Sequence, residues 1–386
     1  MVKAFNEIKT IGIIGGGQLA RMMIPYAKQL GLKVVILDPS SDCPCVGYVD
    51  KLITAGFSDK AGFLEVAKLA DVITYEFEHI DVLLLKMLEA SGNIVYPSPN
   101  SLEIIQDKFT QKKALRDSNI AVPDFFAVET VEDLMAYYNK NQKPFMLKSR
   151  CGGYDGKGNF VVKNLEECAV GFNELNPKNK GNSLMIEPLV DFEREVSVIA
   201  TRGIDGTTVV YPIGENVHKN SILDTTTVPT VISEKLTEKL IESAKAVMKC
   251  FSGVGTFCTE FFISEKTGEV LVNEVAPRVH NSGHYSIEAC RVSQFENHIR
   301  AVVGLKPSNP ELVVPAAVMK NIIADYNGVA KFSGLEAIAN LPDTNVHIYG
   351  KTEGKIGRKM GHYTTTGEMK EVQGRVKTIE KLMKNT

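Results

Sequence analysis

Short apolar runs alternate with amphipathic stretches over the first hundred positions. Apolar runs at 10–14, 34–37 and 72–75 predict β-strands, and periodic apolar spacing predicts helices over 18–30 and 60–70. Strands that alternate with crossover helices form parallel sheets. The N-terminal segment is therefore predicted to be an α/β domain that ends near 97–99, where PSPN indicates a loop.

The pattern changes after residue 101. A helix is predicted over 102–118, and strands are predicted over 145–149, 159–162, 184–187, 195–200, 256–263 and 269–275. The last two flank SEKTG, which predicts a hairpin. The middle of the chain is thus predicted to be α+β and largely antiparallel. From about residue 307 we expect short strands and turns, followed by a charged C-terminal helix.

Composition narrows the function classes. The 386 residues suffice for two or three domains, and a formal net charge of -2 provides no basic field for nucleic acid, so no nucleic-acid partner is expected. No apolar run approaches the roughly 18 residues of a membrane helix, so no membrane partner is expected either. Seven dispersed cysteines predict reduced thiols and a cytoplasmic location.

A glycine turn at 15–17 follows the first strand and precedes the first helix. With Ala20 it fits G-x-G-x-x-A, and Asp38 ends the next strand, which is the spacing of a dinucleotide-binding fingerprint. A nicotinamide-dependent dehydrogenase is therefore one hypothesis. A tight strand-to-helix turn without a ligand explains the same residues equally well.

A second glycine-rich segment lies between two predicted strands at 148–158. Four glycines there expose backbone N–H groups to an anion, and Lys157 adds a mobile charge. The spacing is not that of a Walker A loop, which opens a helix. A loop between two strands can instead cover nucleotide phosphates as a flap, with Lys148 and then Lys108 as further phosphate ligands. A solvent-exposed hairpin turn is the alternative.

Two carboxylates interrupt apolar strands on either side of SEKTG. If Ile263 pairs with Glu269, then Glu260 lies opposite Val272, and Glu274 is its diagonal neighbour on the same face, roughly 7–8 Å away. Like charges side by side are unfavourable without a cation. The pair therefore predicts Mg²⁺ shared with phosphates, since Mg²⁺ prefers oxygen ligands.

Polar residues follow the second of these strands directly, in PRVHNSGH. Arg278 suits a planar oxyanion, and His280 and Asn281 can donate to the same anion. No cysteine or further histidine spacing in this segment predicts a zinc site. Glu76 and Glu78 lie at the C-terminal end of a predicted parallel strand, where α/β proteins usually bind ligands.

Two further segments can complete such a site. The linker at 187–190 can offer backbone groups to an adenine edge, and Glu195 can accept from ribose hydroxyls. The basic, glycine-rich segment at 350–362 contains Lys351 and Arg358 and can close over a sugar phosphate. A basic run is, however, usually a solvated face.

Together these segments resemble the ATP-grasp superfamily and, within it, the 5-(carboxyamino)imidazole ribonucleotide synthetases of purine biosynthesis. The matching segments run from residue 11 to about 362 and include IGIIGGGQLARM, TYEFEHI, KSRCGGYDGKG, TEFFI, VNEVAPRVHNSGHYSIEAC and HIYGK…GRKMGH. The combination of GGYDGKG with APRVHNSGHYSIEA is far more specific than the glycine triplet. The resemblance implies an ATP-grasp fold with an N-terminal parallel-sheet domain at 1–104, an ATP-grasp domain at 105–304 with a lid at about 120–190, and a small C-terminal domain at 305–386. It also implies a homodimer.

The resemblance also implies a role for each candidate residue. The implied ATP contacts are Lys108, Lys148, Gly153, Tyr154, Asp155, Gly156, Lys157, Gly158, Asn159, Glu187, Pro188, Leu189, Val190, Glu195, His218, Asn273 and Glu274. The implied contacts to aminoimidazole ribonucleotide are Gln18, Glu76, Tyr154, Asp155, Lys351 and Arg358, those to bicarbonate are Arg278, His280 and Asn281, and those to Mg²⁺ are Glu260 and Glu274. The glycine turn at 15–17 would then hold the substrate's ribose phosphate.

The implied reaction is carboxylation of aminoimidazole ribonucleotide with bicarbonate, driven by ATP through carboxyphosphate. Asp155 or His280 would manage the amine proton, and the lid would exclude water. Three alternatives remain at this point: another ATP-grasp ligase, such as a formate-dependent glycinamide ribonucleotide transformylase; a nicotinamide-binding dehydrogenase or sensor; and a nucleotide-binding regulatory module.

Overall fold

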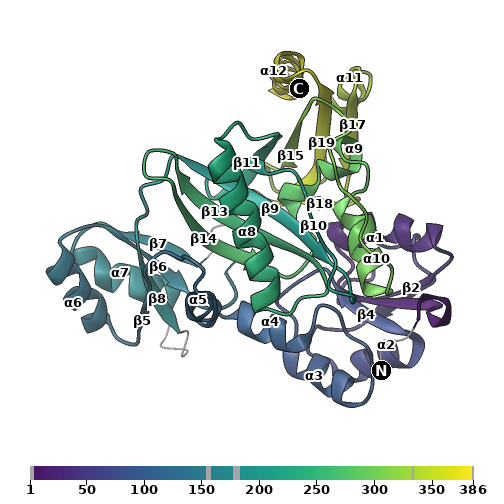
Figure 1. The fold of residues 1–386 in the computed structure, drawn as a ribbon, viewed down its shortest axis with the longest axis horizontal. Helices are drawn as coiled ribbons and strands as arrows, with labels where there is room; N and C mark the ends of the chain where they lie inside the picture. Colours follow the sequence, from purple (N-terminus) through teal and green to yellow (C-terminus); the bar gives the residue numbers. More distant parts are fainter. Residues whose placement is uncertain (1–3, 154–157, 177–182, 333, 385–386) are drawn as a thin grey trace.

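A computed structural model describes residues 4–153, 158–176, 183–332 and 334–384 (Figure 1). Tyr154, Asp155, Gly156 and Lys157, all of them predicted site residues, lie outside the described residues. Within the described ranges the strands form a parallel sheet near the N-terminus, a long antiparallel sheet, a four-stranded lid sheet and a two-stranded ribbon. In the same ranges, no helix has the length and apolar character needed to cross a membrane.

The N-terminal region is a parallel sheet in the order β3-β2-β1-β4. Its strands and helices are β1 (Thr10–Ile14), α1 (Gln18–Gln29), β2 (Lys33–Asp38), β3 (Lys51–Thr54), α2 (Lys60–Leu69), β4 (Val72–Tyr75), α3 (Val82–Ala90) and α4 (Pro99–Gln106), after a short 3-10 turn at Phe5–Glu7. Almost every residue of β1, β2 and β4 is buried, as expected for strands covered on both faces. The predicted α/β character is confirmed.

The segment predicted to be the lid, at the left of Figure 1, forms an antiparallel sheet in the order β5-β8-β6-β7 with two helices packed on it. Its elements are β5 (Phe126–Val128), α6 (Val131–Asn141), β6 (Phe145–Ser149), β7 (Asn159–Val162), α7 (Glu166–Leu175) and β8 (Leu184–Pro188). Strand β6 pairs with both β7 and β8, so the glycine-rich segment between β6 and β7 joins two neighbouring strands, as predicted.

The central antiparallel sheet runs in the order β14-β13-β9-β11-β12-β15-β19-β17, with β10 paired to β9. Its central elements are α5 (Lys108–Asp117), β9 (Arg194–Arg202), β10 (Thr208–Val210), β11 (Gly214–Lys219), β12 (Ile222–Val228), α8 (Glu234–Cys250), β13 (Gly255–Ser264), β14 (Glu269–Ala276), η3 (Asn281–Gly283), α9 (Ser286–Ala289) and α10 (Gln294–Val302). Helix α8 covers one face of this sheet (Figure 1).

The C-terminal region extends the central sheet, because β12 pairs with β15. Its elements are β15 (Ala316–Ile323), β16 (Gly328–Val329), α11 (Leu335–Ala339), β17 (Thr344–Ile348), β18 (Glu353–Gly354), β19 (Lys359–Gly367) and α12 (Met369–Lys384). The predicted charged C-terminal helix is present as α12. The expected short strands are present as β16, β17 and β18, but β15, with 8 residues, and β19, with 9, are longer than expected.

The predicted single helix over 102–118 is in fact two helices, α4 and α5. Asp107 lies between them in an extended conformation and accepts hydrogen bonds from the N–H groups of Phe109 and Thr110, so it caps α5. The apolar periodicity continued across this position, which is why the break was missed. The cap matters because it fixes where α5 begins, and so it fixes the direction in which the side chain of Lys108, the first residue of α5, points.

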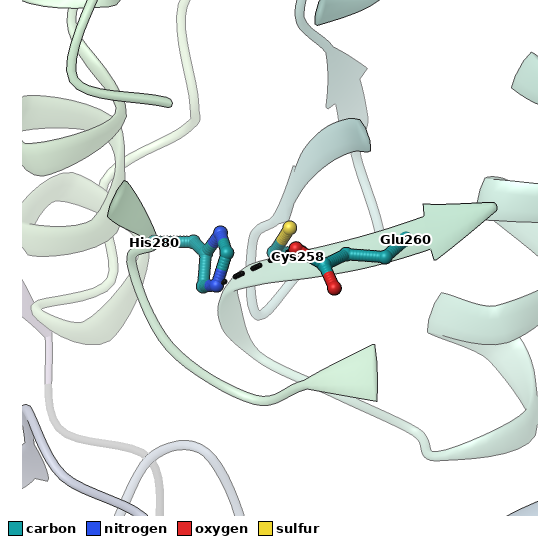
Figure 2. A group of neighbouring side chains, drawn as sticks. All are labelled: Cys258, Glu260 and His280. Atoms are coloured by element: carbon teal, nitrogen blue, oxygen red, sulfur yellow. Dashed lines mark ion pairs between the residues drawn. The ribbon is translucent and has the colours of Figure 1, made fainter. Parts of the chain in front are cut away.

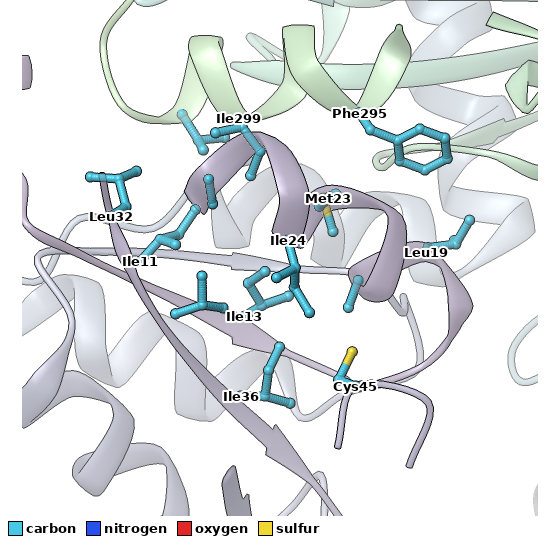
Figure 3. Close-up of a cluster of buried hydrophobic side chains, with 14 of the residues drawn as sticks. Ile11, Ile13, Leu19, Met23, Ile24, Leu32, Ile36, Cys45, Phe295 and Ile299 are labelled. Carbon is cyan, nitrogen blue, oxygen red and sulfur yellow. The ribbon is translucent and has the colours of Figure 1, made fainter. Parts of the chain in front are cut away.

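One hydrophobic core joins the N-terminal region to the central region. It combines residues of β1, β2 and α1 with Phe295, Ile299 and Val302 of α10 and with Val303, which follows the helix (Figure 3). All four of these residues are at most 1% exposed. The two regions therefore share buried apolar surface and are held as one unit, which sets the glycine turn at the start of α1 against the central sheet.

We expect Ile299→Ala to lower the free energy of unfolding by about 2–5 kcal/mol, because it leaves a cavity in this shared core. The measurement is urea denaturation followed by circular dichroism. The control is Leu83→Ala, whose side chain on α3 is 67% exposed and should change stability by less than about 0.5 kcal/mol. Equal effects of the two substitutions would show that the regions do not depend on a common core.

Candidate functional site

The two predicted metal ligands face each other across the hairpin of β13 and β14. The predicted register was wrong by one residue: Ile263 pairs with Val270, and a β-bulge follows between Phe261 and Glu260. The extra residue on β14 is Asn273, so Glu260 pairs with Glu274 directly and not diagonally. The bulge therefore brings the carboxylates closer together than a regular hairpin would.

The negative charges around Glu260 and Glu274 repel one another, and a bound cation would offset this repulsion. Burial, together with the negative charges of Glu195 and Glu274, raises the pKa of Glu260 to about 7. Lys108 lies 3.0 Å from Glu274 and supplies part of the missing positive charge. A set of carboxylate oxygens with excess negative charge fits Mg²⁺, which takes oxygen ligands and shares them with phosphates.

A buried lysine that sequence reasoning missed connects the lid to the bulge. Lys112 of α5 is 2% exposed; its Nζ lies 3.2 Å from Glu187 of β8 and donates to the carbonyl of Asn273 at 2.9 Å. Lys148 of β6 binds the other carboxylate oxygen of Glu187 at 2.7 Å. The signal available in the sequence was spacing, because Lys112 lies four residues after Lys108 on the same face of a helix.

The two positive charges of Lys112 and Lys148 stabilise the negative charge of Glu187. Burial opposes ionisation of Glu187, but the charges of Lys148 and Lys112 outweigh it and lower the pKa of Glu187. Burial lowers the pKa of Lys112 to about 8, although Glu187 opposes the shift. Lys112 is therefore charged at neutral pH, and Glu187 has its negative charge compensated from two sides.

The base of the glycine-rich flap is fixed to the start of α5. Arg150 forms a two-pronged ion pair with Asp107, with an Nη2–Oδ2 distance of 2.6 Å, and its carbonyl accepts from the N–H of Lys108 at 2.8 Å. Gly158 has a φ of +87°, which favours glycine, and Asn159 pairs with Lys148. Gly153 lines a small cleft beside Lys108 and Glu274, so this end of the flap is close to the metal-facing carboxylates.

His218 and Glu195 form a second polar pair beside the metal-facing carboxylates. The His218 Nδ1 lies 3.1 Å from the Glu195 carboxylate. Burial opposes protonation of His218, but its contact with Glu195 raises the pKa. His218 lies at a bulge of β11, where no periodic signal marks it, and it was predicted from resemblance alone.

A pocket of about 570 Å³ borders the linker after β8. It is lined by Pro188, Leu189 and Val190, by the turn between β13 and β14, and by the segment at 122–124. None of the lysines or carboxylates of the preceding paragraphs lines it. The pocket therefore borders the linker and lies apart from those lysines and carboxylates.

The predicted oxyanion residues have partners within the protein. Glu78 accepts two hydrogen bonds from the Arg278 guanidinium, and although burial opposes it, this contact lowers the pKa of Glu78 to about 2. The two side-chain amides of Asn281 and Asn321 bind each other at 2.7 and 3.0 Å. Arg278 is thus oriented by Glu78, and Asn281 is already engaged.

Within this group, the ring of His280 faces Glu260, one of the two predicted metal ligands. Its Nε2 lies 3.9 Å from Glu260, and its Nδ1 accepts from the N–H of Ser282 at 3.3 Å. Burial and then the charge of Arg278 lower the pKa of His280 well below its usual value. The imidazole is therefore neutral, and the bond to Ser282 favours a proton on Nε2.

The glycine turn at the start of α1 holds a carboxylate of the protein itself. Glu76 accepts from the N–H groups of Gly17 at 2.7 Å, Leu19 at 3.0 Å and Ala20 at 3.1 Å. A Cβ atom on Gly17 would lie 2.3 Å from the Glu76 carboxylate, so glycine permits this approach. These helix N-terminal donors are occupied, which disfavours a dinucleotide pyrophosphate and leaves the predicted ribose phosphate no free donor among them.

Glu76 and Glu78 therefore have different surroundings, which the sequence did not separate. Glu76 caps α1, next to Gln18, and Glu78 binds Arg278. Burial raises the pKa of Glu76 despite its backbone donors. The carboxylate beside the glycine turn is thus Glu76, and Glu78 belongs to the oxyanion group.

The basic C-terminal segment reaches the N-terminal region. Arg21 of α1 donates to the carbonyl of Tyr349 at 2.8 Å, just before Lys351. Lys351 donates to the carbonyl of Lys359 at 2.7 Å, and Arg358 binds a carbonyl of its own loop at 2.9 Å. These contacts place the segment beside α1.

Three family models match the chain and together span most of it. They are the ribonucleotide synthetase preATP-grasp domain over residues 8–106, the ATP-grasp domain over residues 113–295, and the phosphoribosylaminoimidazole carboxylase C-terminal domain over residues 317–373. The predicted fold class is confirmed by these matches and by the sheets described above.

A curated relative covers nearly the whole chain. The N5-carboxyaminoimidazole ribonucleotide synthase of Staphylococcus saprophyticus is 38% identical over 366 residues, which are 94% of this chain and 95% of the relative.

Solved structures of similarly named proteins also match nearly the whole chain. An N5-carboxyaminoimidazole synthetase from Staphylococcus aureus complexed with ADP has a TM-score of 0.87 and 37% identity, covering 96% of each chain. The N5-carboxyaminoimidazole synthase of Aspergillus clavatus, in complex with ADP and 5-aminoimidazole ribonucleotide, has a TM-score of 0.88 and 31% identity, covering 98% of this chain and 99% of that one.

Lys112→Met should lower the free energy of unfolding by about 3 kcal/mol, because removing one partner of a buried pair leaves the other charge less compensated. We also expect weaker binding of MgADP, measured by titration calorimetry, because Glu187 and Lys148 lose their common anchor. The control is Lys113→Met, the adjacent lysine, whose side chain is 63% exposed.

A pH series separates this charge effect from a packing effect. Lys112 loses its proton as the pH rises through about 8, so the difference in MgADP affinity between wild type and Lys112→Met should shrink above that pH. A difference that stays constant from pH 7 to pH 9.5 would contradict the role of the lysine charge.

Proposed function

The chain belongs to the N5-carboxyaminoimidazole ribonucleotide synthase family of ATP-grasp ligases, and on this basis we propose which of its residues carry out the reaction. The reaction is the ATP-dependent carboxylation of aminoimidazole ribonucleotide with bicarbonate, through carboxyphosphate, in purine biosynthesis. The observation that supports the assignment most directly is the cross-strand pair Glu260 and Glu274, with Lys108 beside it. Those carboxylates need a cation, and MgATP supplies one.

Phosphoryl transfer from ATP to bicarbonate is the first step. Mg²⁺ held by Glu260 and Glu274 would neutralise charge on the transferred phosphoryl group. Lys108 and Lys148 bind the phosphates, and Asn273 lies beside Glu274 at the nucleotide. The flap residues Gly153–Asn159 cover the phosphates, the linker at 187–190 takes the adenine edge, and Glu195 with His218 takes the ribose.

Bicarbonate lies next to Arg278, His280 and Asn281. Arg278 is oriented by Glu78 and stabilises negative charge as carboxyphosphate forms. Neutral His280 donates through Nε2, because its Nδ1 accepts from Ser282. The low pKa of His280 makes it a weak base, which favours Asp155 as the acceptor of the amine proton.

The aminoimidazole ribonucleotide is placed between the N-terminal and C-terminal regions. Gln18 and Glu76 face it from the start of α1, and Lys351 and Arg358 face it from the basic segment. Tyr154 and Asp155 would reach it from the flap. The exocyclic amine attacks the carboxyl carbon, phosphate leaves, and one proton is released; the lid at about 120–190 excludes water while carboxyphosphate is present.

The setting of the enzyme is also part of the proposal. We propose three domains, at 1–104, 105–304 and 305–386, in a cytoplasmic homodimer that binds no nucleic acid. The net charge of -2 supports the last point, and the seven free thiols support a reducing compartment. The homodimer rests on the family resemblance.

Substrate dependence tests the proposed reaction. ADP release should require MgATP, aminoimidazole ribonucleotide and bicarbonate together, because carboxyphosphate forms only from bicarbonate. The measurement is coupled detection of ADP and phosphate with bicarbonate removed and restored. Turnover with formate and glycinamide ribonucleotide, without any bicarbonate requirement, would instead indicate the transformylase alternative.

Glu274→Gln should reduce turnover by at least about 100-fold, because a neutral amide cannot replace a carboxylate ligand of Mg²⁺. The matched control is Glu269→Gln, at the exposed start of the same strand, which should retain activity. Both variants should be assayed over a range of Mg²⁺ concentrations. Wild-type turnover in Glu274→Gln would overturn the metal assignment.

A further inference from the structure

A thiol stands beside two of the proposed active-site residues without a role in the reaction. Cys258 and Glu260 lie two positions apart on β13 and therefore on the same face of the sheet. His280 approaches them from the segment after β14 (Figure 2). A sulfur, a carboxylate oxygen and an imidazole nitrogen of these three residues all lie within 4.8 Å of one another.

The position of the thiol is fixed by the sheet. Cys258 is 0% exposed and lies on a strand that is paired on both sides, with Ile199 of β9 and Ala276 of β14. The Ser282 hydroxyl lies 3.6 Å from Sγ and is a hydrogen-bond partner of the thiol. A hydroxyl at that distance is a weak partner for a thiol, so the sulfur keeps its capacity to bind another group.

The same network orients the imidazole. The Ser282 hydroxyl lies 2.9 Å from His280 Nδ1, which directs Nε2 toward Glu260 at 3.9 Å. Metal binding takes the other neutral tautomer of His280, in which the proton moves from Nε2 to Nδ1. Nδ1 then donates to the Ser282 hydroxyl, and Nε2 is left with a lone pair for a metal ion. Outer hydrogen bonds of this kind are how proteins orient metal-binding histidines.

The three donors suit a different cation from the one the reaction uses. Mg²⁺ takes oxygen ligands, whereas a set of thiolate, imidazole and carboxylate suits Zn²⁺ and related thiophilic ions. Ligand atoms around a tetrahedral zinc ion stand roughly 3.3–3.6 Å apart, so this cluster needs to contract by about 1 Å. Glu260 and His280 can make that adjustment, since their side chains are 16% and 19% exposed.

We propose that Cys258, Glu260 and His280 form a binding site for a single thiophilic divalent cation of the Zn²⁺ class, and that its occupation inhibits the ligase. Binding releases the thiol proton to solvent, and the thiolate and carboxylate then balance the charge of the ion. The fourth position is open to water or a substrate oxygen. Inhibition rests on the proposed function, because the ion takes Glu260 from Mg²⁺ and His280 from bicarbonate; binding rests on the geometry alone.

Cobalt provides a direct test of binding that does not depend on activity. Titrating Co²⁺ into the metal-free full-length chain, without ATP, should give a thiolate-to-cobalt charge-transfer band that saturates at one ion per chain. Cys258→Ser should abolish the band and weaken binding by about 100-fold or more, since a thiolate ligand is lost. Cys250→Ser, which removes a partly exposed thiol on α8, should leave the band unchanged.

A second variant guards against a folding defect in Cys258→Ser. His280→Ala alters the partly exposed side of the cluster and should also weaken cobalt binding, with an unchanged circular dichroism spectrum. Absence of the charge-transfer band in wild type, or its persistence in Cys258→Ser, would overturn the site.

Activity tests the inhibition separately. With free Zn²⁺ set by a metal buffer, wild-type turnover on MgATP, bicarbonate and aminoimidazole ribonucleotide should fall and recover on chelation. Cys258→Ser should keep its basal turnover and resist Zn²⁺. A cobalt band without zinc inhibition would overturn the inhibitory claim. A chain that shows the cobalt band but no carboxylation under any condition would instead contradict the proposed function and leave the metal site supported.

Discussion

Two negative charges directly opposite each other in an antiparallel pair repel, and the rest of this site is built around such a pair. The extra residue on β14 puts Glu260 against Glu274, where a regular ladder would have offset them. The repulsion is tolerable only if positive charge is near, and α5 brings Lys108 to one of the two carboxylates. The remaining deficit of positive charge is the reason we propose this hairpin as the binding site for Mg²⁺ and for the phosphates that accompany it.

Two other glutamates, Glu78 and Glu187, differ from Glu260 in how their charge is compensated. Glu78 and Glu187 have fixed cationic partners in Arg278, Lys148 and Lys112, and their pKa values are lowered. The pKa of Glu260 is raised, first because its side chain is buried and then because Glu195 and Glu274 add negative charge beside it. Glu78 and Glu187, with fixed cationic partners, hold the architecture in place, and Glu260, with its raised pKa, is where we propose that a cation binds.

Much of this arrangement could be predicted from the sequence, because it depends on local order. Several strand bounds were predicted to within a residue, since apolar runs between turn residues have few other solutions. Glu260 and Glu274 were identified as candidates because they are charged residues within apolar strands, and Arg278 because it lies in the polar segment that follows them. Family resemblance supplied His218, which no periodic pattern marks.

The errors have physical causes as well. A bulge shifts register without any clear mark in a one-dimensional pattern, so the pairing of Glu260 was misjudged. A capping aspartate inside an apolar-periodic segment split one predicted helix. The partner of the glycine turn could not be predicted from local spacing either. Helix N-termini attract anions, and the carboxylate that accepts from this turn is Glu76, which is 59 residues from Gly17 in the sequence. The ribose-phosphate site at the turn stays a prediction. Long-range partners of this kind are not recorded in local spacing.

The continuity of the central sheet has a mechanical consequence. The hairpin with the paired glutamates and the strands that carry the basic substrate segment belong to one hydrogen-bonded ladder, and α10 is packed into the N-terminal region. The hairpin and the basic segment are therefore held in one frame, and their separation is set by strand spacing. With nucleotide and acceptor at the proposed sites, conformational change during turnover can be confined to the β5–β8 sheet and its two helices.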